Sequence, residues 1–160
     1  MSPGVARKGC IYNHLVSRRA VDPVEVACLS TSVRMSARVL ARRYDEALRP
    51  FGIRTSQFSM LDLLASEGPM PLGRLAARLA IDRTTATRDT RLLASRGLVD
   101  VAVGVDRRQR VIALTRAGAA VVEAATPAWR EVQASVRDLL GAELVDRVID
   151  DARQVTRVMA

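Results

Sequence analysis

Cysteine, histidine, aromatic residues and long hydrophobic runs are all scarce in this sequence, and each scarcity argues against a class of protein. The two cysteines, Cys10 and Cys28, are too few for a disulfide framework and fit a reducing cytosol. The single histidine, His14, lies in a stretch without clear periodicity, so no Ser-His-Asp or Cys-His group can be assigned to the ordered part. The sequence has no Cys/His cluster with metal-ligand spacing and no glycine-rich phosphate loop. We therefore expect neither an enzyme nor a protein with a metal or cofactor.

The scarcity of aromatic residues and of long apolar runs limits the ligands that the protein can bind and the places in the cell where it can work. Aromatic residues make up 3% of the chain, too few for platforms on which single-stranded bases stack. No apolar run approaches the roughly 20 residues needed to cross a bilayer. The basic N-terminus has no uninterrupted apolar core before a small-residue cleavage site, so it does not look like a signal peptide. These features predict a cytoplasmic protein without a membrane partner.

Positive charge is what the sequence has in excess. Its 25 basic residues outnumber 17 acidic ones, which gives a net charge of +8, and Lys8 is the only lysine among them. The segment charges are +4 for residues 1–71, +6 for 72–116 and −2 for 117–160. Arginine's planar fork suits phosphate oxygens and guanine edges. The middle segment therefore predicts a surface for a polyanion, although its composition also fits a solvated basic face.

The N-terminal third of the chain predicts a tail and then a long helix. Residues 1–21 show no clear period and are expected to form the tail. Asp22-Pro23-Val24-Glu25 has the residues of a helix start, with proline at the first helical position. Apolar residues then recur at helical spacing until Pro50-Phe51-Gly52 ends the run.

Three shorter helices and a hairpin follow. The helices are expected over residues 56–66, with Thr55 as the cap, over 71–79, and between Asp82 and Gly97. The β-branched segments LVDVAV and RVIAL are typical of two strands around a loop at Gly104–Gln109. Helices joined by tight turns and followed directly by a hairpin are the pattern of a winged helix-turn-helix. The predicted fold class is mainly α with a small β-hairpin wing.

The helix after Asp82 is the one expected to read DNA. With Ala86, Thr90, Leu93 and Gly97 toward the core, its open face carries short hydroxyls and arginines: Arg83, Thr84, Thr85, Thr87, Arg88 and Arg91. Threonines near a helix N-terminus can approach phosphates and thymine methyls, and arginine can reach O6 and N7 of guanine. An ordinary surface helix with capping threonines remains the alternative, because such short motifs are unspecific.

The hairpin loop crowds three arginines, Arg107, Arg108 and Arg110, into four positions. A hairpin beside the reading helix would lie over the adjacent minor groove, where negative potential is focused when the groove is narrow. Asp106 can hold Arg107 or Arg108 in an extended pose, and Arg110 can contact a flanking phosphate. The alternative is a solvated turn.

The helices at both ends of the chain carry apolar stripes that a winged core of about 60 residues does not need. We expect residues 116–160 to form two helices, the first capped by Thr115 and crossed by Pro127. Stripes of this length are most often buried in a two-fold dimer, with an elaborate single-chain bundle as the alternative. The predicted domain is 22–160, with dimerisation helices at 22–54 and 116–160 around a DNA-binding core at 55–115.

Three stretches together resemble the MarR family of transcriptional regulators: TSQFSMLDLLASEG, PLGRLAARLAIDRTTATRDTRLLASRGLV and DRRQRVIALTRAG. The resemblance covers about residues 28–118. It implies groove-facing roles for Thr84, Thr85, Thr87 and Arg88, and a wing pair of Asp106 and Arg108. It also implies a homodimer on a pseudo-palindromic operator, usually repressing, released by a small ligand or by cysteine oxidation. Two departures from the family are Thr90, where an aliphatic residue is commoner, and a first wing strand without the extra charges of many members.

The sequence says least about the site at which a signal would release the protein from DNA. A pocket between the dimerisation helices and the winged core, touching Arg34, Met35, Tyr44 or Trp129, is expected to bind a small-molecule effector. Cys28 lies where peroxide-sensing members of the family have a reactive cysteine, so a redox-sensing regulator is an alternative; free cysteine is also a common buried residue. A second alternative is an adaptor or interaction module that does not bind DNA.

Overall fold

The computed structural model of the chain describes residues 28–104, 106 and 108–159. The expected tail at 1–21, the expected helix start at Asp22, and the residues Cys10, His14 and Arg107 lie outside these described residues. No helix in the described part is long and apolar enough to cross a membrane. Nor do those residues contain a group of three His, Cys, Asp or Glu side chains that could hold a metal ion.

The first helix, α1 (Leu29–Leu48), crosses the boundary between the chain's two compact units, Met1–Arg38 and Val39–Ala160. Its apolar residues Val33 and Val39 are exposed, whereas Leu48 is fully buried in the core of the second unit. The short 3-10 helix η2 (Arg49–Phe51) follows and ends at Gly52, which has a φ of 70°. Pro50 and this left-handed glycine end the helix where the sequence predicts.

Helix α2 (Thr55–Glu67) begins one residue earlier than expected, and Thr55 is not its cap. The Thr55 side chain donates a hydrogen bond to Oδ1 of Asp45 at 2.8 Å, and its backbone N–H donates to the same oxygen at 2.7 Å. The N-cap residue is Arg54, whose backbone N–H donates to Oε1 of Gln57. The prediction of Thr55 as cap was therefore wrong, because a carboxylate from α1 accepts from the first turn of α2 in its place.

Two helices form the helix-turn-helix: α3 (Leu72–Arg78) and α4 (Arg83–Ser95). Asp82 caps α4, since its Oδ1 accepts from the backbone N–H of Thr85 at 2.8 Å. After Ser95 the chain turns at Gly97, which has a φ of 67° and lies at the position that favours glycine. Both boundary predictions for this helix are confirmed.

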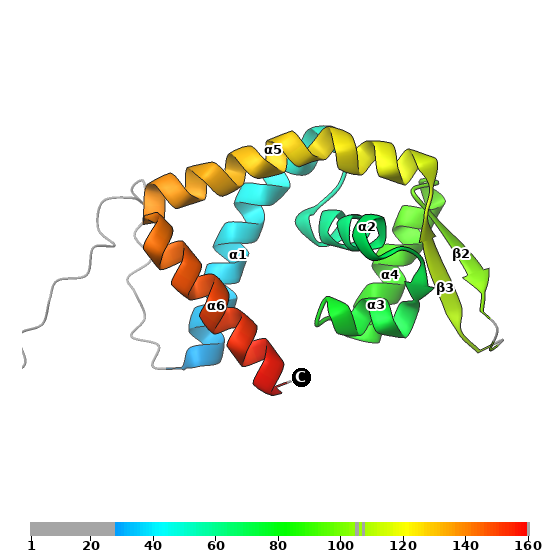
Figure 1. Cartoon of the computed structure of the whole chain (residues 1–160), viewed down its shortest axis with the longest axis horizontal. Helices are drawn as coiled ribbons and strands as arrows, with labels where there is room; N and C mark the ends of the chain where they lie inside the picture. The colour runs from blue at the N-terminus through cyan, green and yellow to red at the C-terminus, as the bar shows by residue number, and fades with distance from the viewer. Residues whose placement is uncertain (1–27, 105, 107, 160) are drawn as a thin grey trace, which may run out of the picture. The chain divides into compact units, whose positions relative to one another are not determined.

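The sheet has three strands in the order β1-β3-β2, one more than the sequence analysis predicted (Figure 1). Strands β2 (Val99–Val103) and β3 (Arg110–Leu114) form the expected hairpin, with Val101 opposite Ile112. Strand β1 (Met70–Pro71) pairs Met70 with Ile112 on the other edge of β3. Two residues that include a proline give no strand signal, so β1 forms only because β3 is beside it.

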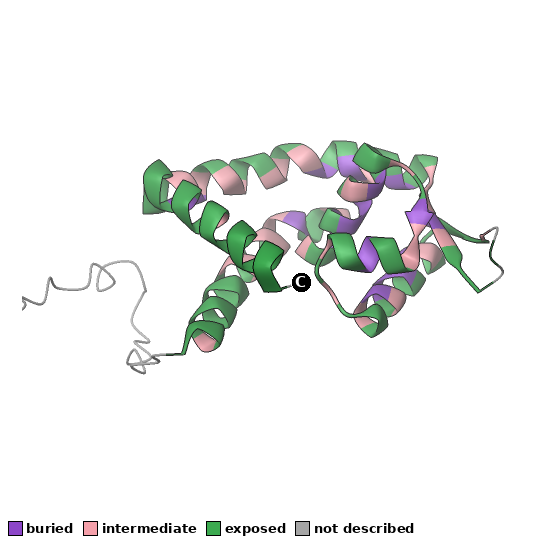
Figure 2. Cartoon of the chain, turned by 60° about the horizontal axis from the view of Figure 1, so that its bottom comes forward, coloured by how far each residue is buried: buried purple, intermediate pink, exposed green. Residues whose placement is uncertain are grey.

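The hydrophobic core of the second unit lies where α2, α4, the sheet and the first half of α5 meet (Figure 2). Its buried residues are Leu48, Ile53, Phe58, Met60, Leu61, Leu64, Met70, Leu75, Leu93, Leu98, Val99, Ile112, Val122 and Ala125.

Helices α5 (Arg116–Leu140) and α6 (Ala142–Met159) end the chain. Thr115 caps α5 as predicted, its Oγ1 accepting from the backbone N–H of Gly118 at 3.0 Å. The helix continues through Pro127. In α6, Val145 is buried and Val148 and Val155 are exposed, and Figure 2 shows most of this helix as exposed surface. The prediction of a mainly α protein with a small β wing is confirmed.

Candidate nucleic-acid interface

The first turn of α4 is held by a set of short side chains. The Asp82 carboxylate accepts hydrogen bonds from the side chain of Thr85 at 2.6 Å and from its backbone N–H. These two bonds hold the pKa of Asp82 below its usual value. The hydroxyl of Thr87 donates to the carbonyl of Arg83 at 2.7 Å. The helix start therefore has a fixed geometry before any ligand arrives.

The buried face of α4 follows the spacing predicted from the sequence, but Gly97, which was expected to face the core, is exposed because the chain has already left the helix there. Ala86, Thr90 and Leu93 are buried, with the Thr90 hydroxyl donating to the sulfur of Met60 at 3.7 Å. Of the six residues proposed to face DNA, four are exposed and two are half-buried. The exposed four are Arg83, Thr84, Arg88 and Arg91, and the half-buried two are Thr85 and Thr87.

One polar residue of α4 was not singled out by the sequence analysis. Asp89 is 6% exposed, and its Oδ2 accepts a hydrogen bond from the hydroxyl of Ser56 at 3.3 Å. Its other oxygen lies 3.6 Å from Nε of Arg88. The spacing of Asp89, three residues after Ala86 and four before Leu93, is the signal that could have identified it as buried.

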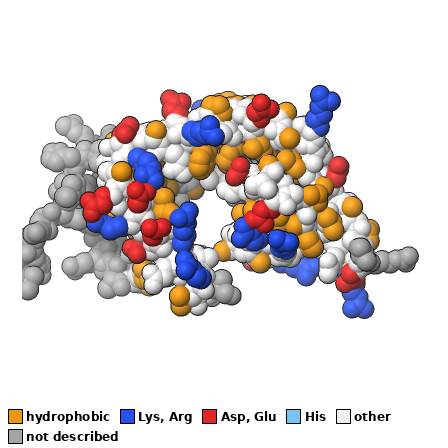
Figure 3. Space-filling model, in the orientation of Figure 1, with side chains coloured by type: hydrophobic (Ala, Val, Ile, Leu, Met, Phe, Trp, Pro, Cys, Tyr) orange, Lys and Arg blue, Asp and Glu red, His pale blue; other side chains and the backbone are white. Residues whose placement is uncertain are grey.

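The wing turn is closed by backbone and carboxylate contacts. Gln109 donates from its backbone N–H to the carbonyl of Asp106 at 2.8 Å, and Gly104 donates to the carbonyl of Gln109 at 3.0 Å. The Asp106 carboxylate accepts from the backbone N–H of Arg108 at 2.9 Å. Asp106 and Arg108 are thus in contact, but through the main chain of Arg108, which leaves the direction of its guanidinium to other partners. Acidic and basic side chains project at the hairpin tip, at the lower right of Figure 3.

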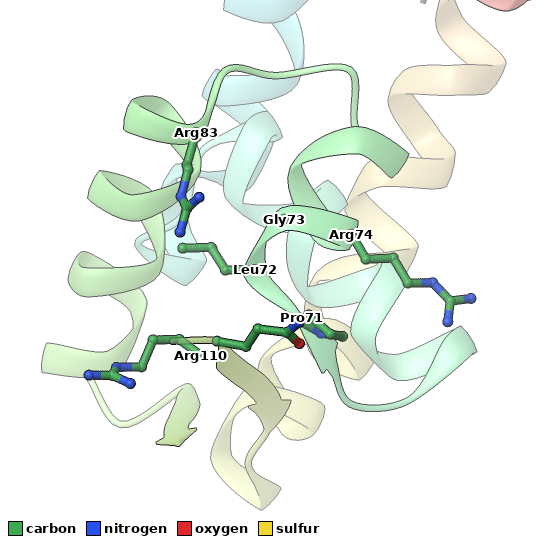
Figure 4. Close-up of a pocket in the computed structure, with 7 residues that line it drawn as sticks. Pro71, Leu72, Gly73, Arg74, Arg83 and Arg110 are labelled. Carbon is green, nitrogen blue, oxygen red and sulfur yellow. The ribbon is translucent and has the colours of Figure 1, made fainter. Parts of the chain in front are cut away.

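A pocket of about 320 Å³ lies between the start of α3, the start of α4 and the start of β3. Seven residues line it: Pro71, Leu72, Gly73, Arg74, Arg83, Gln109 and Arg110. Figure 4 shows the Arg83 side chain reaching toward Leu72, with the guanidinium groups of Arg74 and Arg110 directed to opposite sides. The N-terminus of α4 and the loop end of strand β3 therefore border one open hollow with arginine side chains around it.

Two contacts tie the end of α4 to its neighbours. The guanidinium of Arg96 donates to the carbonyls of Gly52 and Phe51 in the loop before α2. The Thr115 hydroxyl donates to the carbonyl of Gly97 at 2.7 Å, and the Thr115 backbone N–H donates to the carbonyl of Leu98 at 3.2 Å. The orientation of α4 is thus fixed from both its α2 side and its α5 side.

The residues proposed for effector binding fall into two groups. Tyr44 and Trp129 are half-buried neighbours with ring centroids 6.4 Å apart, and Trp129 also stacks on Phe58 at 5.9 Å. Burial raises the pKa of Tyr44. Arg34 and Met35 are exposed residues of the N-terminal half of α1. A pocket that joins all four remains a prediction.

Cys28 directly precedes α1 and is exposed. Hydrogen bonds from the backbone and side chain of Thr31, and from the backbone of Ser30, lower the pKa of its thiol. A thiolate at the start of a helix is stabilised in this way and is the reactive form of cysteine.

Comparison with known proteins finds similar sequences and a similar fold. Residues 53–108 match the MarR family. The HTH-type transcriptional regulator YwoH of Bacillus subtilis is 34% identical over 84 residues, which are 52% of this chain and 61% of that protein. An uncharacterised HTH-type transcriptional regulator of Mycobacterium leprae is 33% identical over 135 residues, covering 78% of this chain and 92% of the relative. The structure is similar to that of the Mycobacterium tuberculosis transcriptional regulator MosR in complex with DNA, with a TM-score of 0.72, 38% identity, and coverage of 82% and 97%.

Proposed function

The chain belongs to the MarR family of transcriptional regulators, and from this premise we propose that it binds an operator as a homodimer and represses transcription. Helix α4 would read the major groove of double-stranded DNA, and the β2–β3 hairpin would contact the adjacent minor groove. A small-molecule effector, whose identity the chain does not reveal, would release the protein. An operator target makes the cytoplasm the compartment of action.

The observation that carries this proposal is the shared hollow between the start of α4 and the loop end of the β2–β3 hairpin. Arg83 borders it from the helix and Arg110 from the hairpin. Between a major groove and the next minor groove runs one phosphate backbone, so a protein that reads both grooves must meet that backbone between its two reading elements. The arginines that border this hollow supply the positive charge that phosphate groups require.

The individual roles follow from exposure and side-chain length. Arg88 and Arg91 are exposed on α4 and long enough to reach a guanine, while Thr84 is short and suited to close approach at the phosphate or a thymine methyl. Arg108 at the hairpin tip would enter the minor groove, where the potential is most negative when the groove is narrow. Arg107 would act beside it. Thr85 and Thr87, with hydroxyls already bonded inside the helix start, would present mainly their methyl groups.

The homodimer is supported by the hydrophobic side chains that the single chain leaves in solvent. On α6, Val148, Val155 and Met159 are exposed, and on α1 Val33 and Val39 are exposed. Exposed apolar side chains grouped on helices mark an interaction surface, and a two-fold contact between copies is the commonest kind. Residues of α1, α5 and α6 would therefore form the dimer interface.

A second candidate for the switch is oxidation of Cys28. It is favoured by the exposure of this thiol and by the contacts of Thr31 and Ser30 that lower its pKa. An exposed thiol with increased thiolate character is the type that peroxides oxidise.

The proposed function is tested by binding to duplex DNA selected from a randomised pool. Arg88→Ala should cost about 1–3 kcal/mol on the selected duplex and relax base preference at one position in each half-site, because a bidentate contact is lost. Arg130→Ala is the matched control, since Arg130 is an exposed arginine that belongs to neither α4 nor the hairpin; sedimentation of this variant checks that its association is unchanged. A wild-type protein that selects no duplex would refute DNA binding and favour an adaptor or interaction module.

A further inference from the structure

We infer that Asp89 is a positioning residue for DNA reading, and that its buried carboxylate holds the side chain of Arg88 in the orientation that meets the base. The inference rests on the proposed role of Arg88 as a reader of the operator and adds to it the residue that sets the direction of that reader.

Asp89 lies on the buried face of α4, where charged side chains are rare. A buried charge is costly unless it is paired, and a hydrophobic residue of similar volume is often at least as stable in its place. The neighbouring positions of the same face are Ala86, Thr90 and Leu93, which are all buried. Asp89 therefore has to be explained by what its two oxygens contact rather than by stability.

Each oxygen of Asp89 has a partner. Oδ2 accepts from the hydroxyl of Ser56, the second residue of α2, at 3.3 Å. This contact fixes the carboxylate against the N-terminal turn of α2, where a negative charge is favoured. Oδ1 lies 3.6 Å from Nε of Arg88 and is directed to the edge of the core where α4 becomes exposed. The carboxylate thus has an anchor on one side and an arginine on the other.

The contact with Arg88 has an unusual geometry for a helix. Adjacent residues of a helix point in different directions and do not normally meet. The side chain of Arg88 is 76% accessible and that of Asp89 is 8% accessible, so the contact joins an exposed guanidinium to a buried carboxylate. Because Asp89 contacts Nε, the nitrogen nearest the stem, the two terminal nitrogens keep the parallel arrangement that matches O6 and N7 of guanine.

An arginine held in this way loses less side-chain freedom when it binds DNA. A free arginine samples many rotamers, and ordering it opposes binding. The buried carboxylate also selects one direction, so the benefit should appear as discrimination between bases at one position rather than as general affinity for DNA. Replacement by asparagine keeps the size of the side chain and removes its charge.

The test uses the full-length protein and duplexes selected by the wild type from a randomised pool. Affinities are then measured on the selected duplex, on duplexes with each other base at every position of the half-sites, and on random duplex. The variants are Arg88→Ala, Asp89→Asn, the double variant, and Asp62→Asn as the control for the same chemical change at an exposed position of α2. Thermal unfolding is recorded for each variant.

Asp89→Asn should reduce base discrimination about 3- to 10-fold, as coupled neighbours do, at the position that Arg88→Ala affects. Binding to random duplex should be unchanged. The double variant should discriminate no less than Arg88→Ala alone, because Asp89 acts through Arg88. Asp62→Asn should leave all preferences unchanged.

Several results overturn the inference. If Asp89→Asn discriminates between bases as sharply as the wild type, the carboxylate does not direct Arg88. Equal weakening on all duplexes, or an additional loss in the double variant, shows a purely structural role. If Asp89→Asn does not fold, Ser56→Ala replaces it: a smaller loss at the same position supports the inference, and unchanged preference overturns it. If Arg88→Ala still discriminates between bases as the wild type does, the inference is overturned while DNA binding stands. If the wild type selects no duplex, the proposed function is refuted and this inference with it.

Discussion

Gly118, in the first turn of α5, is expected to tolerate no side chain. A Cβ atom at this position would lie 2.1 Å from the carbonyl oxygen of Leu98 and 2.7 Å from Cδ1 of Leu114. The Leu98 carbonyl cannot move freely, because it accepts the backbone N–H of Thr115 at 3.2 Å. Gly118→Ala therefore pushes α5 away from the point where α4 passes into β2.

The size of the effect follows from these distances. Carbon and oxygen atoms in contact are about 3.3–3.6 Å apart, so the two backbones must separate by more than about 1 Å. Overpacking of this kind typically costs about 1–3 kcal/mol. Replacing a helical glycine by alanine stabilises the folded protein by about 0.5–1 kcal/mol, which offsets part of this cost. We expect a net loss of about 1–2 kcal/mol, or a decrease of about 2–8 °C in Tm for a chain of this length.

The assay is thermal unfolding at one fixed protein concentration, because association makes Tm concentration-dependent. Gly73→Ala is the matched control, since Gly73 is a helical residue of α3 and a Cβ there meets nothing within 4 Å. It should raise Tm slightly, by the conformational effect alone. The same substitution should thus have opposite signs at the two positions. A Gly118→Ala protein that unfolds at or above the wild-type temperature would refute the close approach of α5 to Leu98.

Three further outcomes are expected. Arg110→Ala should reduce the slope of log K against log salt by about 0.9, as loss of one phosphate contact does, and an unchanged slope would remove Arg110 from the interface. Sedimentation at micromolar concentration should give about twice 17.4 kDa, and truncation after Leu140 should abolish the dimer; a stable full-length monomer contradicts the proposed assembly. In a Cys10→Ser background, alkylation of Cys28 should reach its half-maximal rate at a lower pH than alkylation of a cysteine in an unfolded peptide, because its pKa is lowered and the thiolate predominates above that pKa. Thr31→Ala should move that midpoint upward, and equal profiles would contradict the role of the Thr31 hydroxyl.

The parts of the fold that the sequence predicts correctly are those encoded by neighbouring residues. Asp82 and Thr115 bond to backbone groups three residues away, and Gly97 has the positive φ that few other residues adopt. Their positions can be recognised from composition because the interaction partner is within the same turn. The two strands of the wing are likewise defined by their own β-branched residues.

The parts that the sequence does not predict depend on distant partners. Strand β1 exists because Met70 and Pro71 lie beside β3, some 40 positions along the chain. Thr55 looks like a cap by residue type, but its bonds go to Asp45. The helical spacing of Asp89 places it on the buried face, but its contact with Ser56 of α2 cannot be recognised in the stretch TRDTR. Each depends on packing, which overrides local preference.

The bond from Asp45 to the start of α2 has a consequence for anyone who would build chimeric regulators. A cut just before Thr55 would separate the helix-turn-helix and wing from the carboxylate that accepts from Thr55, and also from Leu48, which is fully buried in the core. The fragment would begin with unsatisfied amides and an empty site in its interior. A transplantable DNA-recognition module should therefore include the last turns of α1. Exchanging operator preference between relatives then requires transfer of part of a helix that we propose for the dimer interface, so in that assembly a change of specificity would also change the surface that pairs the subunits.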